Sequence, residues 1–231
     1  MTENRSNISF KDKKEAAEKL IAELPVNLFT LDNVIVLGVS IEGVYFADQL
    51  SQKLSCKMDV LLTEPIFSNV NHELAIAIVG ETEEIVMHKA LIDAFNISKD
   101  YIYSEANRKY VEEITYYKNK YRDGLDLENL DQKYVILTDE CVETGLTMMA
   151  AVKAAISLGA KNIFIAVPIL DKVVYENLVT ICDNIYCPEK IDDYISKEYY
   201  YEILEPLEYD EIEAMIKKNK KKFDEGNMNN E

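Results

Sequence analysis

An apolar strand that runs directly into two carboxylates is the most informative chemical feature of this sequence. Asp139 and Glu140 follow Tyr134–Thr138, a short run rich in residues that favour strands. In an open parallel sheet, ligands bind beyond the carboxyl ends of the strands. Two neighbouring carboxylates there can accept hydrogen bonds from vicinal hydroxyl groups, such as those of a ribose, and can help to hold a hydrated magnesium ion.

The residues after the acid pair have the composition of a phosphate-binding loop. This loop leads into an apolar helix, whose first N–H groups and dipole favour an anion such as a sugar 5′-phosphate. Thr144 and Thr147 add hydroxyl donors, and Gly145 allows the backbone to approach a phosphate closely. The alternative interpretation is a solvated turn followed by ordinary helix capping. The candidate loop residues are Cys141, Val142, Glu143, Thr144, Gly145, Leu146 and Thr147.

Hydrophobic periodicity predicts the elements that position this segment. The expected helices are Phe10–Leu24, Val44–Leu54, His88–Phe95, Lys99–Arg122, Thr147–Leu158, Asp171–Thr180 and Asp210–Lys222. The expected strands are Val34–Gly38, Met58–Leu62, Leu74–Val79, Tyr134–Thr138, Asn162–Val167 and Asn184–Cys187, with a long loop over Glu64–Glu73. Strands separated by helices of this length favour parallel pairing through right-handed crossovers.

The chain is long enough for one well-filled core, and no internal segment has the composition of a linker. We therefore expect a single α/β domain over residues 1–231, an open parallel sheet with helices on both faces. Residues 1–30 would contain its first helix, and residues 208–231 a last helix with a charged tail. The tyrosine-rich helical segment Lys99–Arg122 is expected to lie over the site or at a subunit contact.

The balance of charge excludes several classes of function. Acidic residues outnumber basic ones by 42 to 25, and the formal net charge is −17. Such a surface repels nucleic acid and anionic lipid alike. No apolar run approaches the roughly 20 residues that span a bilayer, and Met1–Lys14 is too polar for a signal peptide, so a cytoplasmic protein is expected. A phosphorylated ligand would need local donors or a metal ion.

The cysteines and histidines show no catalytic or metal-binding spacing. Cys56, Cys141, Cys182 and Cys187 lack the paired spacing of zinc sites, so we expect reduced thiols and no bound metal. The acids beside Cys141 would raise its thiol pKa, which argues against a nucleophile. His72 and His88 have no acid or serine partner at a motif spacing.

The segment Val135–Thr147 resembles the phosphoribosyl-diphosphate motif of type I phosphoribosyltransferases. The likeness rests on the hydrophobic strand, the two acids, Thr144-Gly145 and Thr147, followed by an amphipathic helix and Gly159-Ala160-Lys161. It extends more loosely over most of the chain. The nearest resemblance is to phosphoribosyltransferases of undefined acceptor.

The resemblance implies roles for three groups of residues. Asp139 and Glu140 would contact the ribose hydroxyls and Cys141–Thr147 would bind the 5′-phosphate. The pyrophosphate loop would be Val39, Ser40, Ile41, Glu42 and Gly43. It further implies a small hood over the sheet, Mg²⁺ bound mainly through the phosphoribosyl diphosphate, an unidentified acceptor and a homodimer.

Two positions depart from the pattern of this family. The loop Val39–Gly43 contains Glu42 where relatives present arginine or lysine, and a carboxylate repels pyrophosphate. Thr63-Glu64-Pro65-Ile66 also lacks a basic residue that relatives tend to carry there. Four residues of the central helical region are candidates for supplying the missing positive charge: Lys89, Arg108, Lys109 and Arg122.

Two hypotheses follow, and a third has no positive signature. The first is an enzyme that transfers a 5-phosphoribosyl group from phosphoribosyl diphosphate to an unidentified acceptor. The second, motivated by Glu42, is a non-catalytic protein that keeps the fold and binds a nucleotide or phosphoribosyl ligand for regulation. A hydrolase of a phosphosugar or nucleotide is the third.

Overall fold

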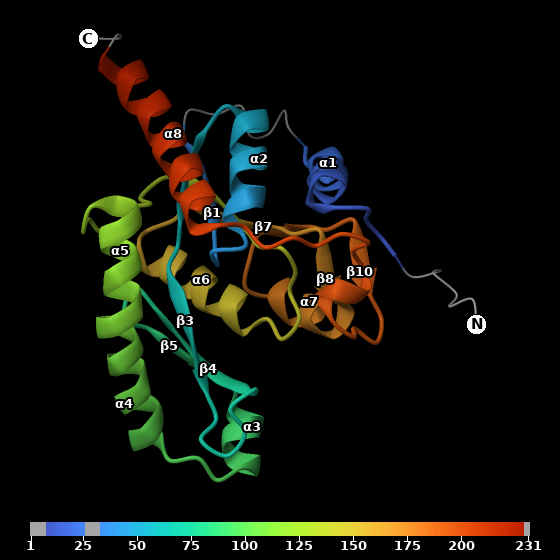
Figure 1. The fold of residues 1–231 in the computed structure, drawn as a ribbon, viewed down its shortest axis with the longest axis vertical. Helices are drawn as coiled ribbons and strands as arrows, with labels where there is room; N and C mark the ends of the chain where they lie inside the picture. Colours follow the sequence, from blue (N-terminus) through green and yellow to red (C-terminus); the bar gives the residue numbers. More distant parts are fainter. Residues whose placement is uncertain (1–7, 26–32, 229–231) are drawn as a thin grey trace.

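Five short strands form a parallel sheet in the order β2-β1-β6-β7-β9 (Figure 1). The strands are β1 (Val34–Gly38), β2 (Lys57–Val60), β6 (Tyr134–Thr138), β7 (Asn162–Ala166) and β9 (Asn184–Tyr186). The structure, a computed structural model, describes residues 8–25 and 33–228, with side chains up to Phe223. The central strands are buried on both faces, which explains their unbroken apolar sequence.

Successive residues of each strand pack into opposite layers. Val34, Val36 and Ile136 pack in the core cluster that holds α1 (Lys13–Glu23), α2 (Val44–Leu54) and α8 (Tyr209–Met228). Ile35, Leu37 and Val135 pack in the cluster that holds α6 (Leu146–Ser157) and α7 (Lys172–Leu178). Figure 1 shows the first group of helices on one side of the sheet and α6 and α7 on the other. The α/β fold with helices on both faces is confirmed.

A second, antiparallel sheet forms the hood. Its strands follow the order β3-β4-β5 and are β3 (Thr63–Phe67), β4 (Ala75–Gly80) and β5 (Ile85–Met87). Ile78 and Val86 of this sheet pack on Leu146 and Ala150 of α6. The helices that follow are α3 (Lys89–Ala94), α4 (Lys99–Lys109), the π-helical turn η2 (Tyr110–Ile114) and α5 (Thr115–Arg122). Figure 1 shows α4 and α5 beside this sheet, as one nearly continuous rod.

The loop predicted over Glu64–Glu73 is wrong in its first part. Residues Thr63–Phe67 form β3, which pairs antiparallel with β4. Only Ile66 of this strand is buried, so the hydrophobic pattern is weak. Pro65 is tolerated because β3 is an edge strand, where one side of the backbone needs no donor.

Three further short strands were missed by the sequence pattern, and one of them is β5 of the hood. The other two lie elsewhere in the chain. These are β8 (Ile169–Asp171) and β10 (Glu189–Ile191), which pair in parallel with each other outside the main sheet. The predicted helices and the remaining strands are present, with ends that differ by a few residues. Within the described ranges, no helix combines the length and apolar character needed to cross a membrane.

A buried ion pair joins the end of the helical rod to the end of β4. Arg122, at the end of α5, pairs through Nη2 with Glu81 Oε2, and the two side chains are 4% and 3% exposed. Glu81 Oε1 also accepts a hydrogen bond of 2.8 Å from the backbone N–H of Leu62. One carboxylate therefore anchors both the chain that leaves β2 and the end of the long helical rod.

Replacing this arginine is expected to destabilise the fold strongly. In Arg122→Met, Glu81 stays buried without its cation. The free energy of unfolding should fall by about 3 kcal/mol, which is toward the lower end of the range for broken buried ion pairs. The lower end applies because Nε and Nη1 of Arg122 lack a hydrogen-bond partner, and their desolvation cost disappears too. Urea unfolding measures the effect. Arg108→Met is the control. It removes the exposed ion pairs with Glu105 and Glu112 and should scarcely change the urea concentration at the midpoint of unfolding. Equal midpoint shifts in both variants would contradict the assignment.

Candidate active site

The register of the central strands brings the two predicted loops together. Gly38 of β1 lies opposite Thr138 of β6, and the N–H of Val39 donates to the carbonyl of Thr138 over 3.0 Å. Both chains therefore leave the sheet at the same edge. A Cβ on Gly43 would lie 2.7 Å from the Thr138 carbonyl oxygen, which is closer than real Cβ contacts. Only glycine lets these loops approach so closely.

Ser40 links the two loops by hydrogen bonds. Its hydroxyl donates to Asp139 Oδ1 over 2.6 Å and accepts from the N–H of Gly43 over 3.0 Å. Asp139 Oδ1 also accepts from the N–H of Glu140 over 2.8 Å. The first acid of the pair is thus held in one orientation by the loop Val39–Gly43.

Burial perturbs the titration of Asp139. Desolvation raises the pKa of this carboxyl to about 7, against the hydrogen bonds from Ser40 and Glu140 N–H that lower it. The negative charges of Glu42 and Glu140 raise it further. A carboxyl with this pKa is poised between its charged and neutral forms near neutral pH, as is common at functional sites.

The second acid occupies a different environment. The Glu140 side chain is 2% exposed, and its two oxygens lie 2.8 Å from Lys13 Nζ and 2.6 Å from Lys197 Nζ. Lys13 belongs to α1 and Lys197 to the 3-10 turn η3 (Lys197–Tyr199). The predicted contact of Glu140 with ribose hydroxyls stays a prediction, but in the structure both of its oxygens are occupied by ammonium groups. Neither lysine is near Glu140 in the sequence, so no local pattern could reveal the contact.

The loop Cys141–Thr147 is anchored on β8 and opens at the start of α6. The N–H of Val142 donates to Ile169 O over 2.9 Å, and Asp171 N–H donates to Val142 O over 3.0 Å. Gly145 precedes α6 with φ of 75°, and no side chain caps the helix there. A Cβ on Gly145 would lie 2.5 Å from Val174 Cγ1. The free N–H groups of a helix start can bind an anion.

The remaining residues of the loop Cys141–Thr147 differ in how far they are buried. Val142 and Leu146 are buried, Thr147 is half-buried, and Glu143 and Thr144 are exposed. The N–H of Leu146 donates to Thr144 Oγ1 over a long distance of 3.5 Å. Both threonines are at least partly accessible to solvent at the start of α6.

The cysteines form no disulfide. Burial raises the pKa of Cys141 to about 12, with Asp139 adding to the effect, so its thiol stays protonated. His88 Nδ1 accepts from Leu91 N–H as a helix cap, and His72 is exposed in a turn. Among the described residues, no three His, Cys, Asp or Glu side chains gather as they would around a metal ion.

One of the four basic candidates lies beside the loop Val39–Gly43. Lys109 Nζ lies 3.3 Å from Glu64 Oε2. Burial raises the pKa of Glu64, Lys109 lowers it, and the charge of Glu42 adds a smaller upward contribution. The same region holds a small hollow lined in part by Ser40, Thr63, Glu64 and Tyr117. Lys109 is therefore close enough to affect this loop, although two carboxylates already hold it.

The other three basic candidates are engaged or located elsewhere. Arg122 is buried against Glu81, and Arg108 pairs with two glutamates on the surface of α4. Lys89 is exposed at the start of α3. The lysines that do lie beside the acid pair, Lys13 and Lys197, were missed because their contacts span 127 and 57 positions.

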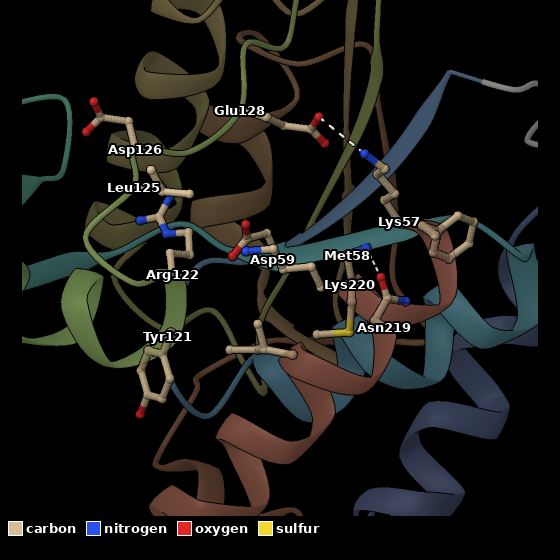
Figure 2. A pocket seen from close by; sticks show the side chains of 12 residues that line it. Lys57, Met58, Asp59, Tyr121, Arg122, Leu125, Asp126, Glu128, Asn219 and Lys220 are labelled. Atoms are coloured by element: carbon tan, nitrogen blue, oxygen red, sulfur yellow. Dashed lines mark hydrogen bonds and ion pairs between the residues drawn. The ribbon is translucent and has the colours of Figure 1, made fainter. Parts of the chain in front are cut away.

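A cavity of about 180 Å³ lies between β2, the end of α5 and α8, away from the strand ends just described (Figure 2). Its lining includes Lys57, Asp59 and Asn219, and none of the residues of the two loops. In Figure 2 Lys57 is joined to Glu128, and the N–H of Met58 to Asn219, at 3.7 and 2.9 Å. Several of its polar groups thus satisfy one another.

A phosphoribosyl transferase domain family matches residues 7–203 of the chain. This protein belongs to that family. A Mycobacterium tuberculosis protein named "Putative phosphoribosyl transferase" is 25% identical over 178 residues, in both strains compared. The match covers 77% of this chain but 40% of the relative, so the chain spans about two fifths of that protein's length.

A solved structure shows the same fold over nearly the whole molecule. Protein TT1426 of Thermus thermophilus superposes with a TM-score of 0.70 and 23% sequence identity, covering 90% of this chain and 98% of that one. The family and this likeness confirm the fold and the resemblance predicted from the motif. The roles of individual site residues stay predictions.

The raised pKa of Asp139 predicts how its contribution to stability depends on pH. The folded state binds the proton more tightly than the unfolded chain, so the contribution is present at acid pH and lost as pH rises through about 7. Asp139→Asn removes this loss. The free energy of unfolding of the variant, relative to the native protein, should increase between pH 5.5 and pH 8.5.

Urea unfolding at the two pH values measures this difference. Asp93→Asn, at an exposed position in α3, is the control and should give the same difference at both pH values. A difference for Asp139→Asn that does not change with pH would show that its carboxyl titrates normally.

Proposed function

We propose that this protein binds 5-phosphoribosyl diphosphate at the carboxyl ends of β1 and β6 and transfers its phosphoribosyl group to an acceptor. The single observation that carries the proposal is the junction of Asp139 with the loop Val39–Gly43 through Ser40. These bonds hold the Asp139 carboxylate against the loop Val39–Gly43, at the edge of the sheet where the loop Cys141–Thr147 begins. Membership of the phosphoribosyl transferase family supports this reading.

In this proposal each part of the donor has its own contact. Asp139 accepts hydrogen bonds from the ribose hydroxyls, and Glu140 acts through its lysine partners instead of touching the sugar. Cys141–Thr147 binds the 5′-phosphate with backbone N–H groups and the hydroxyls of Thr144 and Thr147. Val39–Gly43 faces the diphosphate. Catalysis would then come from orienting the donor and stabilising the charge of the departing diphosphate.

Magnesium fits the donor atoms at this edge. Mg²⁺ prefers carboxylate, water and phosphate oxygens and is often bound by one or two carboxylates together with a substrate phosphate. Asp139 and Glu42 are the carboxylates that would hold it, with the diphosphate of the donor supplying further oxygens. When bound, the ion neutralises charge on the diphosphate, which also removes the repulsion that Glu42 alone would cause.

Titration with the donor tests the role of Asp139. Asp139→Asn should weaken binding of magnesium phosphoribosyl diphosphate and of ribose 5-phosphate by about 10- to 100-fold, because hydrogen bonds to a charged acceptor are lost. Binding of inorganic diphosphate without magnesium should change little, because Asp139 meets the diphosphate only through the ion. Isothermal titration calorimetry gives all three affinities. Absence of donor binding by the native protein would refute the proposal itself.

A second substitution tests the helix start. Gly145→Ala places a Cβ against Val174 and strains a left-handed backbone, so the loop must move away from its position. Affinity for ribose 5-phosphate should fall by at least tenfold, while affinity for inorganic diphosphate stays within about threefold. Gly124→Ala, another left-handed glycine but beyond α5, is the matched control. Equal losses in both variants would indicate general destabilisation.

Glu42 supports a competing, non-catalytic function. It is exposed on the loop that faces the diphosphate, and it adds to the negative potential at Asp139. Magnesium-dependent release of diphosphate in the presence of a panel of nucleobases distinguishes the two. Release with any acceptor supports the transferase, whereas tight donor binding without release favours a binding or regulatory protein.

A homodimer, expected from the family, is tested by light scattering.

A further inference from the structure

Two ammonium groups meet one buried carboxylate beside the candidate active site. Lys13 and Lys197 contact different oxygens of Glu140, at 2.8 and 2.6 Å. Because the carboxylate carries one negative charge, this group of three residues has one positive charge in excess. In a chain of formal charge −17, that excess is centred on Glu140, two residues after the end of β6 at Thr138.

The two lysines differ in their access to ligand. The side chain of Lys13 is 10% exposed, whereas that of Lys197 is 34% exposed. Lys13 is therefore enclosed and can neutralise Glu140 by itself. Lys197 reaches the surface, and its flexible four-carbon chain lets the ammonium group change partners without moving the backbone.

Lys197 also lies within electrostatic reach of the loop that faces the diphosphate. Burial lowers its pKa, but Glu140 and then Glu42 raise it, and the net shift is upward. Cys141, in the phosphate loop, contributes in the same direction. The ammonium group is thus charged at neutral pH, and Glu42 and Cys141, one from each loop, lie within its electrostatic range.

The backbone that carries Lys197 is firmly held. Tyr201 Oη donates to the carbonyl of Glu140 over 3.3 Å, and Tyr200 O accepts from the N–H groups of Ser9 and Phe10 over 2.9 and 3.0 Å. Tyr200 and Tyr201 are buried. A change of partner by Lys197 therefore needs only a side-chain rotation, since its chain segment is fixed to both Glu140 and the segment before α1.

We propose that Lys197 supplies the positive charge that the loop Val39–Gly43 lacks, by leaving Glu140 to bind the diphosphate of the donor. Lys13 then remains as the partner of Glu140. This inference rests on the proposed function and deepens it by naming the diphosphate-binding cation. In this proposal Glu140 and the diphosphate compete for Lys197. If the ion pair between Glu140 and Lys197 were purely structural, there would be no such competition.

Lys197→Gln is the first test, read by calorimetric titration with three probes. In the presence of magnesium, affinities for phosphoribosyl diphosphate and for inorganic diphosphate should fall by about 10- to 100-fold, because a charge-assisted hydrogen bond is lost. Affinity for ribose 5-phosphate, which has no diphosphate, should stay within about threefold. Equal loss for all three probes, or no loss for diphosphate, would overturn the inference.

Glu140→Gln provides a test of opposite sign. Without the competing carboxylate charge, Lys197 is released, and affinity for inorganic diphosphate should rise by about two- to tenfold. A fall in diphosphate affinity like that in Lys197→Gln would show that the pair is only structural. Lys197→Arg keeps the charge and should retain most of the affinity for diphosphate. It provides the test if Lys197→Gln does not fold.

Lys133→Gln is the matched control. Lys133 pairs with Glu128 at 3.1 Å with a side chain 25% exposed, and it lies just before β6, at the other end of the strand from Asp139. All three affinities should be unchanged in this variant. If the native protein binds none of the probes, the proposed function fails. If it binds them and Lys197→Gln binds them equally, only the role of Lys197 fails.

Discussion

The hydrogen bond from Ser40 to Asp139 is the contact on which the candidate site depends. Parallel pairing of β1 with β6 brings two loops to one edge of the sheet, but pairing alone does not orient their side chains. Gly43 lets the first loop approach Thr138 within a distance that excludes any Cβ, and Ser40 then bridges that loop to the carboxylate. A change at Ser40, Gly43 or Asp139 would leave both loops present but remove the contact that orients the carboxylate of the candidate site.

Much of this architecture could be predicted from the sequence because its signals are local. The strands before Gly38 and Asp139 are continuous apolar runs, which is typical of strands covered on both faces. The acid pair, Thr144-Gly145 and Thr147 identify the second loop by spacing alone. The family match over residues 7–203 confirms the fold that this motif implied. By contrast, β3 was missed because Thr63, Glu64 and Pro65, all half-buried, give it neither strand periodicity nor an apolar run.

The parts that could not be predicted depend on contacts between distant residues. Asp139 contacts Ser40, whereas Glu140 contacts lysines of α1 and η3. The sequence around these two neighbouring acids does not reveal this difference. Successive side chains at a strand end point to opposite sides, so adjacent acids are expected to have different surroundings. The identity of those surroundings was set by α1 and by the chain near Tyr200, more than fifty positions away. The same limit applied to Lys109, whose approach to Glu64 depends on the long rod of α4, η2 and α5.

An acidic protein that binds a highly charged phosphate has to keep its cations available without leaving them unpaired. An isolated buried ammonium group is costly, and a fully exposed one is weakened by solvent and salt. Sharing Glu140 between Lys13 and Lys197 avoids both extremes, because the carboxylate remains neutralised when one lysine leaves. The cost of releasing Lys197 is therefore smaller than that of breaking a simple buried pair, where the remaining charge would be uncompensated. In the role proposed for Lys197, affinity for the diphosphate depends on the competition between Glu140 and the ligand for this lysine, and less on the net charge of the chain.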